Sequence, residues 1–102
     1  MTLMEFSIFP LDKGISVSKY VARVLDIVDK SGIDYKLNPM GTVIEGEWED
    51  LLGLLDKCFR ALEADSDRII LQIKVDYRKG DANRLSSKLK SVEQKVGRAL
   101  KT

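Results

Sequence analysis

The sequence predicts an α+β fold of the ferredoxin-like type, a βαββαβ sandwich with one four-stranded antiparallel sheet and an additional C-terminal helix. Three observations predict it. Segments with strand and helix periodicity follow one another in the order β-α-β-β-α-β, and a further helical segment comes last. A Pro-Met-Gly turn joins the two middle strands. The first two helical segments each carry one apolar stripe, so both are expected on the same sheet face.

The first strand and the first helix are predicted over residues 3–9 and 17–30. Apolar and polar side chains alternate along the strand, which places Met4, Phe6 and Ile8 on one face and Glu5, Ser7 and Phe9 on the other. Apolar residues then recur at helical spacing: Val17, Tyr20, Val21, Val24, Leu25 and Val28. Gly32 follows, in a position that suits the left-handed end of a helix.

The central hairpin is predicted over residues 35–46. Pro39 presets a turn, and Gly41 is expected to take the positive φ that follows it. With Pro39 and Met40 at the turn, Asn38 pairs with Gly41 and Leu37 pairs with Thr42. Directly opposed residues share a face, so one face carries Tyr35, Leu37, Thr42 and Ile44. The other face carries Lys36, Asn38, Val43 and Glu45.

The second half of the chain is predicted to contain a helix, a strand and a further helix. Glu47, Glu49 and Asp50 place negative charge at a helix N-terminus, and an apolar face follows over residues 51–62. The longest strand is predicted over residues 68–77, with Gln72, Lys74 and Asp76 on its polar side. A last helix begins near residue 83 and carries a near-heptad apolar seam: Leu85, Leu89, Val92, Val96 and Leu100.

The composition fits one globular domain, residues 1–102, and limits the chemistry. The chain has no histidine, so a Ser-His-Asp triad or a His-ligated zinc cannot form. We therefore expect a protein without catalysis and without a cofactor. Its single cysteine, Cys58, and the lack of an apolar leader or membrane-length segment fit the cytoplasm. Charge is uneven, since residues 78–102 carry eight Lys or Arg and only two acidic residues.

The hairpin resembles the signature of the thiamine-binding protein family, also called the YkoF-like group. The matching residues are Tyr35 and the run Pro39-Met40-Gly41-Thr42-Val43-Ile44-Glu45-Gly46, with a first strand that ends in Pro10 and an acidic helix start at Glu47-Trp48-Glu49. The resemblance implies a ferredoxin-like fold, dimers or tetramers assembled by packing of sheets, and binding of thiamine or its pyrimidine moiety. The single-domain members that the chain resembles have no known catalytic activity.

Six residues are candidates for contact with such a ligand: Ser7, Asn38, Met40, Thr42, Glu45 and Gln72. Glu45 would share a proton with a ring nitrogen of the aminopyrimidine. The hydroxyl and amide groups would supply directional hydrogen bonds, and Met40 an apolar contact. Simpler interpretations stay open, because Glu45 also fits a solvated strand residue, Asn38 a turn residue and Thr42 the core face.

Two other functions stay open. The polar sheet face and the C-terminal seam would also suit a structural or regulatory homo-oligomer that binds no ligand. The basic C-terminal helix would suit phosphate contacts in a nucleic-acid binder. Nucleic acid is the less favoured partner, because the polar sheet face carries Phe9 as its only aromatic residue, where RNA-binding sheets of this topology stack bases on several.

Overall fold

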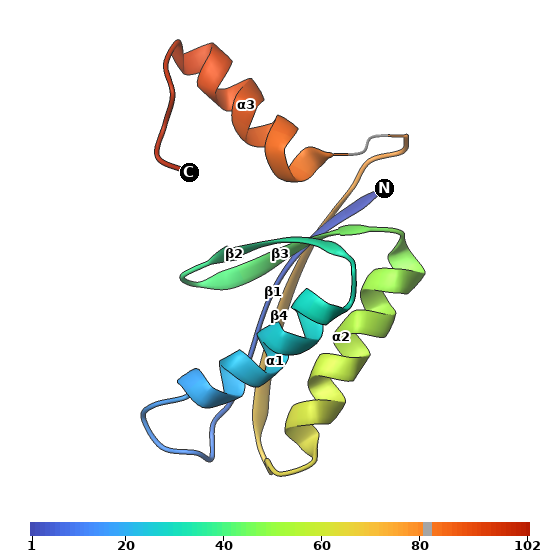
Figure 1. The fold of residues 1–102 in the computed structure, drawn as a ribbon, viewed down its shortest axis with the longest axis vertical. Helices are drawn as coiled ribbons and strands as arrows, with labels where there is room; N and C mark the ends of the chain where they lie inside the picture. Colours follow the sequence, from blue (N-terminus) through green and yellow to red (C-terminus); the bar gives the residue numbers. More distant parts are fainter. Residues whose placement is uncertain (81–82) are drawn as a thin grey trace.

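The computed structural model describes residues 1–80 and 83–102, and its elements follow the predicted order (Figure 1). They are β1 (Thr2–Pro10), α1 (Ser18–Lys30), β2 (Asp34–Asn38), β3 (Gly41–Gly46), α2 (Trp48–Glu63), β4 (Ile69–Tyr77) and α3 (Arg84–Val96). Within the described ranges, every helix is too short or too polar to cross a lipid bilayer.

The four strands form one antiparallel sheet in the order β2-β3-β1-β4. This order and the alternation of strands and helices confirm the ferredoxin-like α+β fold. The hairpin register is also confirmed, because Asn38 pairs with Gly41 and Leu37 pairs with Thr42.

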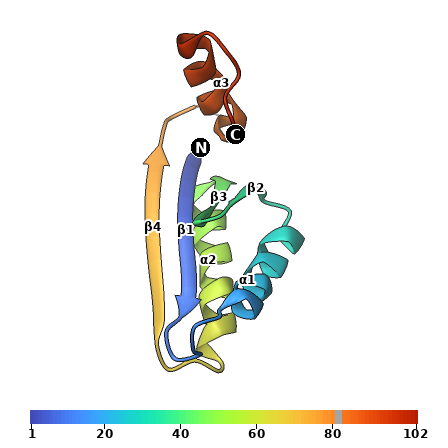
Figure 2. The same ribbon diagram turned by 90° about the vertical axis from the view of Figure 1, so that its left-hand side faces the viewer.

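The core lies between the sheet and the helices α1 and α2, which pack on the same sheet face (Figure 2). The strand residues predicted to face the helices are buried there, with Met4, Phe6 and Ile8 each at most 5% exposed. Cys58 of α2 belongs to this core, and burial raises the pKa of its thiol to about 11. The thiol is therefore protonated at neutral pH and packs as a small apolar group.

Two glycines illustrate different local requirements. Gly32 has a φ of +79° directly after the end of α1, as predicted for a left-handed helix end. Gly41 is not among the residues with positive φ, so that prediction was wrong. A Cβ on Gly41 would lie 3.2 Å from the carbonyl oxygen of Phe6, so glycine serves here for the close approach of the hairpin to β1.

Helix α3 lies beyond one end of the sheet, next to the start of β1 (Figure 2). Polar contacts attach it there. The backbone N–H of Arg84 donates to Oε2 of Glu45 at 2.7 Å. The Arg84 guanidinium donates to the backbone oxygen of Asp76 at 2.9 Å and to its carboxylate. Lys88 also donates to that carboxylate. Most of the predicted seam stays exposed, with Leu89, Val92, Val96 and Leu100 between 37% and 49% accessible.

Candidate functional site

The sheet is uneven in length beside the hairpin turn, and this creates a recess. The pairing of β1 with β3 ends at Phe6 and Thr42, whereas the pairing of β1 with β4 continues to Pro10 and Ile69. The last part of β1 therefore extends past the hairpin turn. Val17, Val21 and Leu25, from the first turns of α1 and the residue before it, line the other side of the same recess.

A cavity of about 380 Å³ occupies this recess, and we call it the hairpin cavity. Its volume falls within the range of small-molecule sites, about 300–1,000 Å³. Five elements and one turn line it: the end of β1, the end of β2, the turn between β2 and β3, the start of β3, helix α1, and β4 through Gln72. It reaches residues of both sheet faces, since both Ile8 and Ser7 contribute to it.

Five of the six candidate residues line the hairpin cavity: Ser7, Asn38, Met40, Thr42 and Gln72. Their environments differ. Thr42 is 5% exposed and lies on the helix-facing side of the sheet, as its strand alternation predicts. Met40 is 90% exposed at the tip of the turn. The cavity thus has one buried hydroxyl and one fully accessible thioether.

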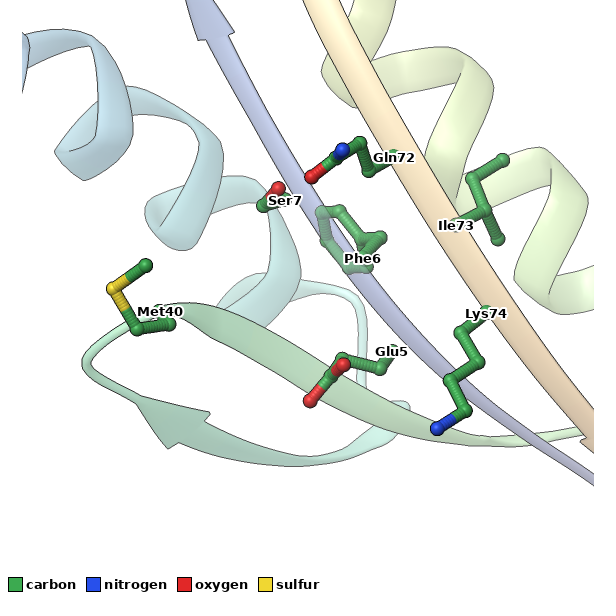
Figure 3. A pocket seen from close by; sticks show the side chains of 7 residues that line it. All are labelled: Glu5, Phe6, Ser7, Met40, Gln72, Ile73 and Lys74. Carbon is green, nitrogen blue, oxygen red and sulfur yellow. The ribbon is translucent and has the colours of Figure 1, made fainter.

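Ser7 and Gln72 form the polar edge of the cavity on the uncovered sheet face. They are paired in the β1–β4 register, and their side chains lie next to each other (Figure 3). A hollow of about 210 Å³ adjoins them and shares Ser7, Met40 and Gln72 with the hairpin cavity. Glu5 and Lys74, the next pair on the same sheet face toward the start of β1, line this hollow. A bound molecule can therefore meet a hydroxyl, an amide, a carboxylate and an ammonium along one line of the sheet.

The apolar wall comes from α1, and the sequence analysis did not assign it to a site. The predicted stripe of α1 divides into two rows. Tyr20, Val24 and Val28 are buried in the core. Val17, Val21 and Leu25 are half-buried and line the hairpin cavity, where Val24 also contributes. The sequence does not separate these two rows, because both belong to the ordinary apolar stripe of an amphipathic helix.

Glu45 stands apart from the other five candidates. It lies at the far end of β3, opposite Leu3, and is only 5% exposed. It does face the same side as Val43, as predicted, but α3 covers it. Its carboxylate accepts the backbone N–H of Arg84 and so satisfies one of the free donors at the start of α3. The structure therefore gives Glu45 a role in holding α3.

The fold and the hairpin cavity together define a class of protein, a small ferredoxin-like domain with a ligand-sized cavity beside its central hairpin. Residues 4–93 match the family model described as thiamine-binding protein. The chain belongs to this family, which confirms the resemblance found in the hairpin.

Similar proteins agree with this assignment. A UPF0045 protein of Methanocaldococcus jannaschii, MJ1052, is 38% identical over 88 residues, which cover 86% of this chain and 88% of that protein. Its crystal structure matches with a TM-score of 0.83 at 35% identity, over 91% of this chain and 96% of that chain. A Thermotoga maritima protein, TM0486, provisionally named for thiamine biosynthesis or salvage, has the same fold. Its TM-score is 0.72 at 23% identity, with 94% of this chain and 95% of that chain covered.

Proposed function

We propose that this protein binds thiamine, or another ligand built on an aminopyrimidine ring, in the hairpin cavity and that it does so without catalysis. One observation carries the proposal. The cavity brings together five residues that the sequence predicts as ligand contacts, from all four strands and the turn between β2 and β3. Membership of the thiamine-binding protein family supports the choice of ligand.

The cavity offers chemistry that suits an aminopyrimidine. Such a ring has two flat apolar faces and an edge of hydrogen-bond donors and acceptors. Val21 and Leu25 of α1 offer an apolar surface for one face, and Met40 offers a polarisable group for the other. Ser7, Asn38 and Gln72 offer both donors and acceptors for the edge. In this proposal Glu45 does not contact the ligand, and Glu5 is the nearer carboxylate, across the shared Ser7 and Gln72.

Titration calorimetry with thiamine, thiamine phosphates and hydroxymethylpyrimidine tests the proposal. Gln72→Ala is the informative variant, because Gln72 is exposed on β4 and takes no part in the core. Loss of a hydrogen bond worth about 1 kcal/mol would weaken binding roughly fivefold. Gln94→Ala on α3 is the matched control, because Gln94 is also exposed but lies away from the cavity.

The expected result is heat of binding with at least one of these compounds, weaker for Gln72→Ala and unchanged for Gln94→Ala. No heat and no thermal shift with any of them would overturn the proposal. Equal affinities of the parent and Gln72→Ala for the ligand would show that Gln72 does not contact it and that the binding site lies elsewhere.

We also propose that the protein is a cytoplasmic homo-oligomer, a dimer or a tetramer, assembled through the uncovered sheet face and α3. The exposed seam of α3 supports this, since Val92 and Val96 are 49% and 42% accessible in the isolated chain. Assembly without any ligand is the alternative function for the same surfaces. The titrations above separate the two, because a purely structural oligomer would give no heat with these compounds.

A further inference from the structure

A second cavity of about 380 Å³ lies between α3 and the uncovered sheet face. We call it the basic cavity. Its sheet side comes from Leu3 of β1, Lys36 of β2 and Val43 of β3. Its other side comes from α3 and from the last residues of the chain. It is separate from the hairpin cavity apart from Asn38, which lines both.

Among the described residues, the charged side chains that line the basic cavity are all cationic. They are Lys36, Arg84, Lys88 and Lys101, which come from a strand, a helix and the C-terminal segment. Asp76 binds two of these cations from the sheet side through its contacts with Arg84 and Lys88. The four cations remain in excess when the carboxylates of Asp76 and Glu45 are counted against them. A cavity with charges of one sign and low-dielectric walls concentrates ions of the opposite sign.

Apart from Asn38 and Thr102, the rest of the cavity wall is apolar. Leu3 and Val43 form the floor on the sheet, and Leu85 and Leu89 face them from α3. Leu89 is 37% exposed although it lines a concave site, so part of its surface is available to a bound molecule. An apolar floor with a few convergent polar groups is the usual composition of a small-molecule site. The combination favours a molecule that has an anionic group at one end and an apolar body at the other.

The way α3 is held adds a second reason to expect an anion. The first turn of α3 contains no acidic residue, and within the described ranges the Glu45 carboxylate accepts a backbone N–H at the positive end of its dipole. The Arg84 guanidinium is held in place by Asp76 and is only 6% exposed. Lys36 is half-buried beside the cavity. Part of the cationic wall is thus fixed in position before any ligand arrives, which lowers the entropic cost of binding.

We propose that the basic cavity binds a small organic anion, a phosphate monoester or a carboxylate with an apolar body. The anionic group would lie against Lys36 and Lys101, and the apolar body would rest on Leu3 and Val43. This site is independent of the hairpin cavity and does not require that the protein bind thiamine.

Calorimetry with four probes tests the proposal at low and at physiological salt. Phenyl phosphate and benzoate carry both parts of the proposed ligand, inorganic phosphate carries only the charge, and phenol carries only the ring. We expect phenyl phosphate or benzoate to bind more tightly than inorganic phosphate and phenol, with weaker binding at higher salt. The tighter of the two identifies the anionic group. Absence of binding by both, or equal binding by inorganic phosphate, would overturn the proposal.

The double variant Lys36→Gln/Lys101→Gln tests the location. Both side chains line the cavity, and neither belongs to the hydrophobic core. We expect at least a roughly fivefold loss of affinity for the tighter probe, as for one close charge pair in water. Lys90→Gln is the matched control, because it removes a charge from the exposed side of α3 outside the cavity. Equal losses in the double variant and the control would show nonspecific attraction and overturn the proposal.

The hairpin cavity supplies the last control. Gln72→Ala should leave phenyl phosphate and benzoate binding unchanged, because Gln72 does not line the basic cavity. If Gln72→Ala weakened these probes as much as the lysine variants do, the two cavities would be one site and the proposal would fail. A failure of thiamine binding alone would leave the basic cavity unaffected.

Discussion

At the scale of single residues, Glu45 shows how one carboxylate can serve the fold in a position that suggests ligand binding. In the sequence, Glu45 lies on the polar side of a predicted strand and belongs to the family signature. We therefore expected its carboxylate to contact the ligand. In the structure it is buried and accepts the backbone N–H of Arg84 at 2.7 Å. It therefore acts as a helix cap that comes from a distant strand, 39 residues earlier in the chain.

Glu45→Gln tests this role. The variant keeps an acceptor oxygen but loses the charge that favours the start of α3, so we expect about 1 kcal/mol less stability of the α3 attachment. Hydrogen exchange of the first amides of α3 should become faster, and thiamine affinity should stay unchanged. Calorimetry and exchange mass spectrometry measure the two effects. Lost thiamine binding with unaltered exchange would instead restore Glu45 as the ligand anchor.

At the scale of elements, α3 is attached to the sheet by charge more than by apolar burial. Asp76 is central to this attachment. The pKa of its carboxyl is lowered from 3.8, chiefly by the hydrogen bond from Lys88 and further by Arg84, while partial desolvation acts in the opposite direction. Because the pKa of Asp76 is lower in the folded state, its carboxylate stabilises the attachment of α3 fully at pH values above the unfolded pKa. It is lost as the pH falls through the folded value.

The lowered pKa of Asp76 predicts how the stability of the α3 attachment changes with pH. We expect amide protection in α3 to be constant from pH 7 to about pH 5 and to fall below about pH 4. Asp76→Asn should lower α3 protection already at pH 7 and flatten the acid response. Asp65→Asn is a matched control, since the pKa of Asp65 is also lowered, by Arg23, in a pair between α1 and the end of α2. Equal α3 protection in Asp76→Asn and the parent at pH 7 would contradict this account.

Most of the fold was predictable at this scale, because it depends on local patterns. The hairpin register followed from the Pro39-Met40 turn, and the buried face of β1 followed from alternation. The site was predictable in part. Ser7 and Gln72 lie on one face by alternation and become neighbours through strand pairing. The contribution of α1 was not predictable, because it depends on how far the helix is shifted relative to the sheet.

The roles of Gly41 and Glu45 also depend on packing between distant segments. Gly41 is required by the carbonyl oxygen of Phe6 on a neighbouring strand. Glu45 is buried because a helix from the end of the chain returns to cover it. In both cases the sequence indicates that the residue matters, but the residue that it contacts lies far away along the chain.

At the scale of the whole molecule, two groups of exposed apolar residues lie at the end of β4 and on α3. The molecule is elongated, with extents of 46 × 29 × 21 Å. Helices α1 and α2 leave the outer part of β4 uncovered, where Ile73, Val75 and Tyr77 are 46%, 42% and 67% exposed. Helix α3 lies beyond the end of the sheet (Figure 1), and most of its seam is exposed. An edge strand and an amphipathic helix that are both unpaired within one chain suit contact with another copy.

Light scattering on the purified chain tests the proposed homo-oligomer. We expect the mass of a dimer or a tetramer for the parent. Val92→Asp should shift the mass toward the monomer, because it places a charge on a seam residue that is 49% exposed and needed only for association. Ser91→Asp adds the same charge next to the seam, on an exposed position, and should keep the parent mass. We expect unchanged unfolding midpoints for both variants, since neither residue belongs to the core. A parent chain that stays monomeric at high concentration would contradict the proposal, and α3 would then be an independent helix whose seam faces solvent.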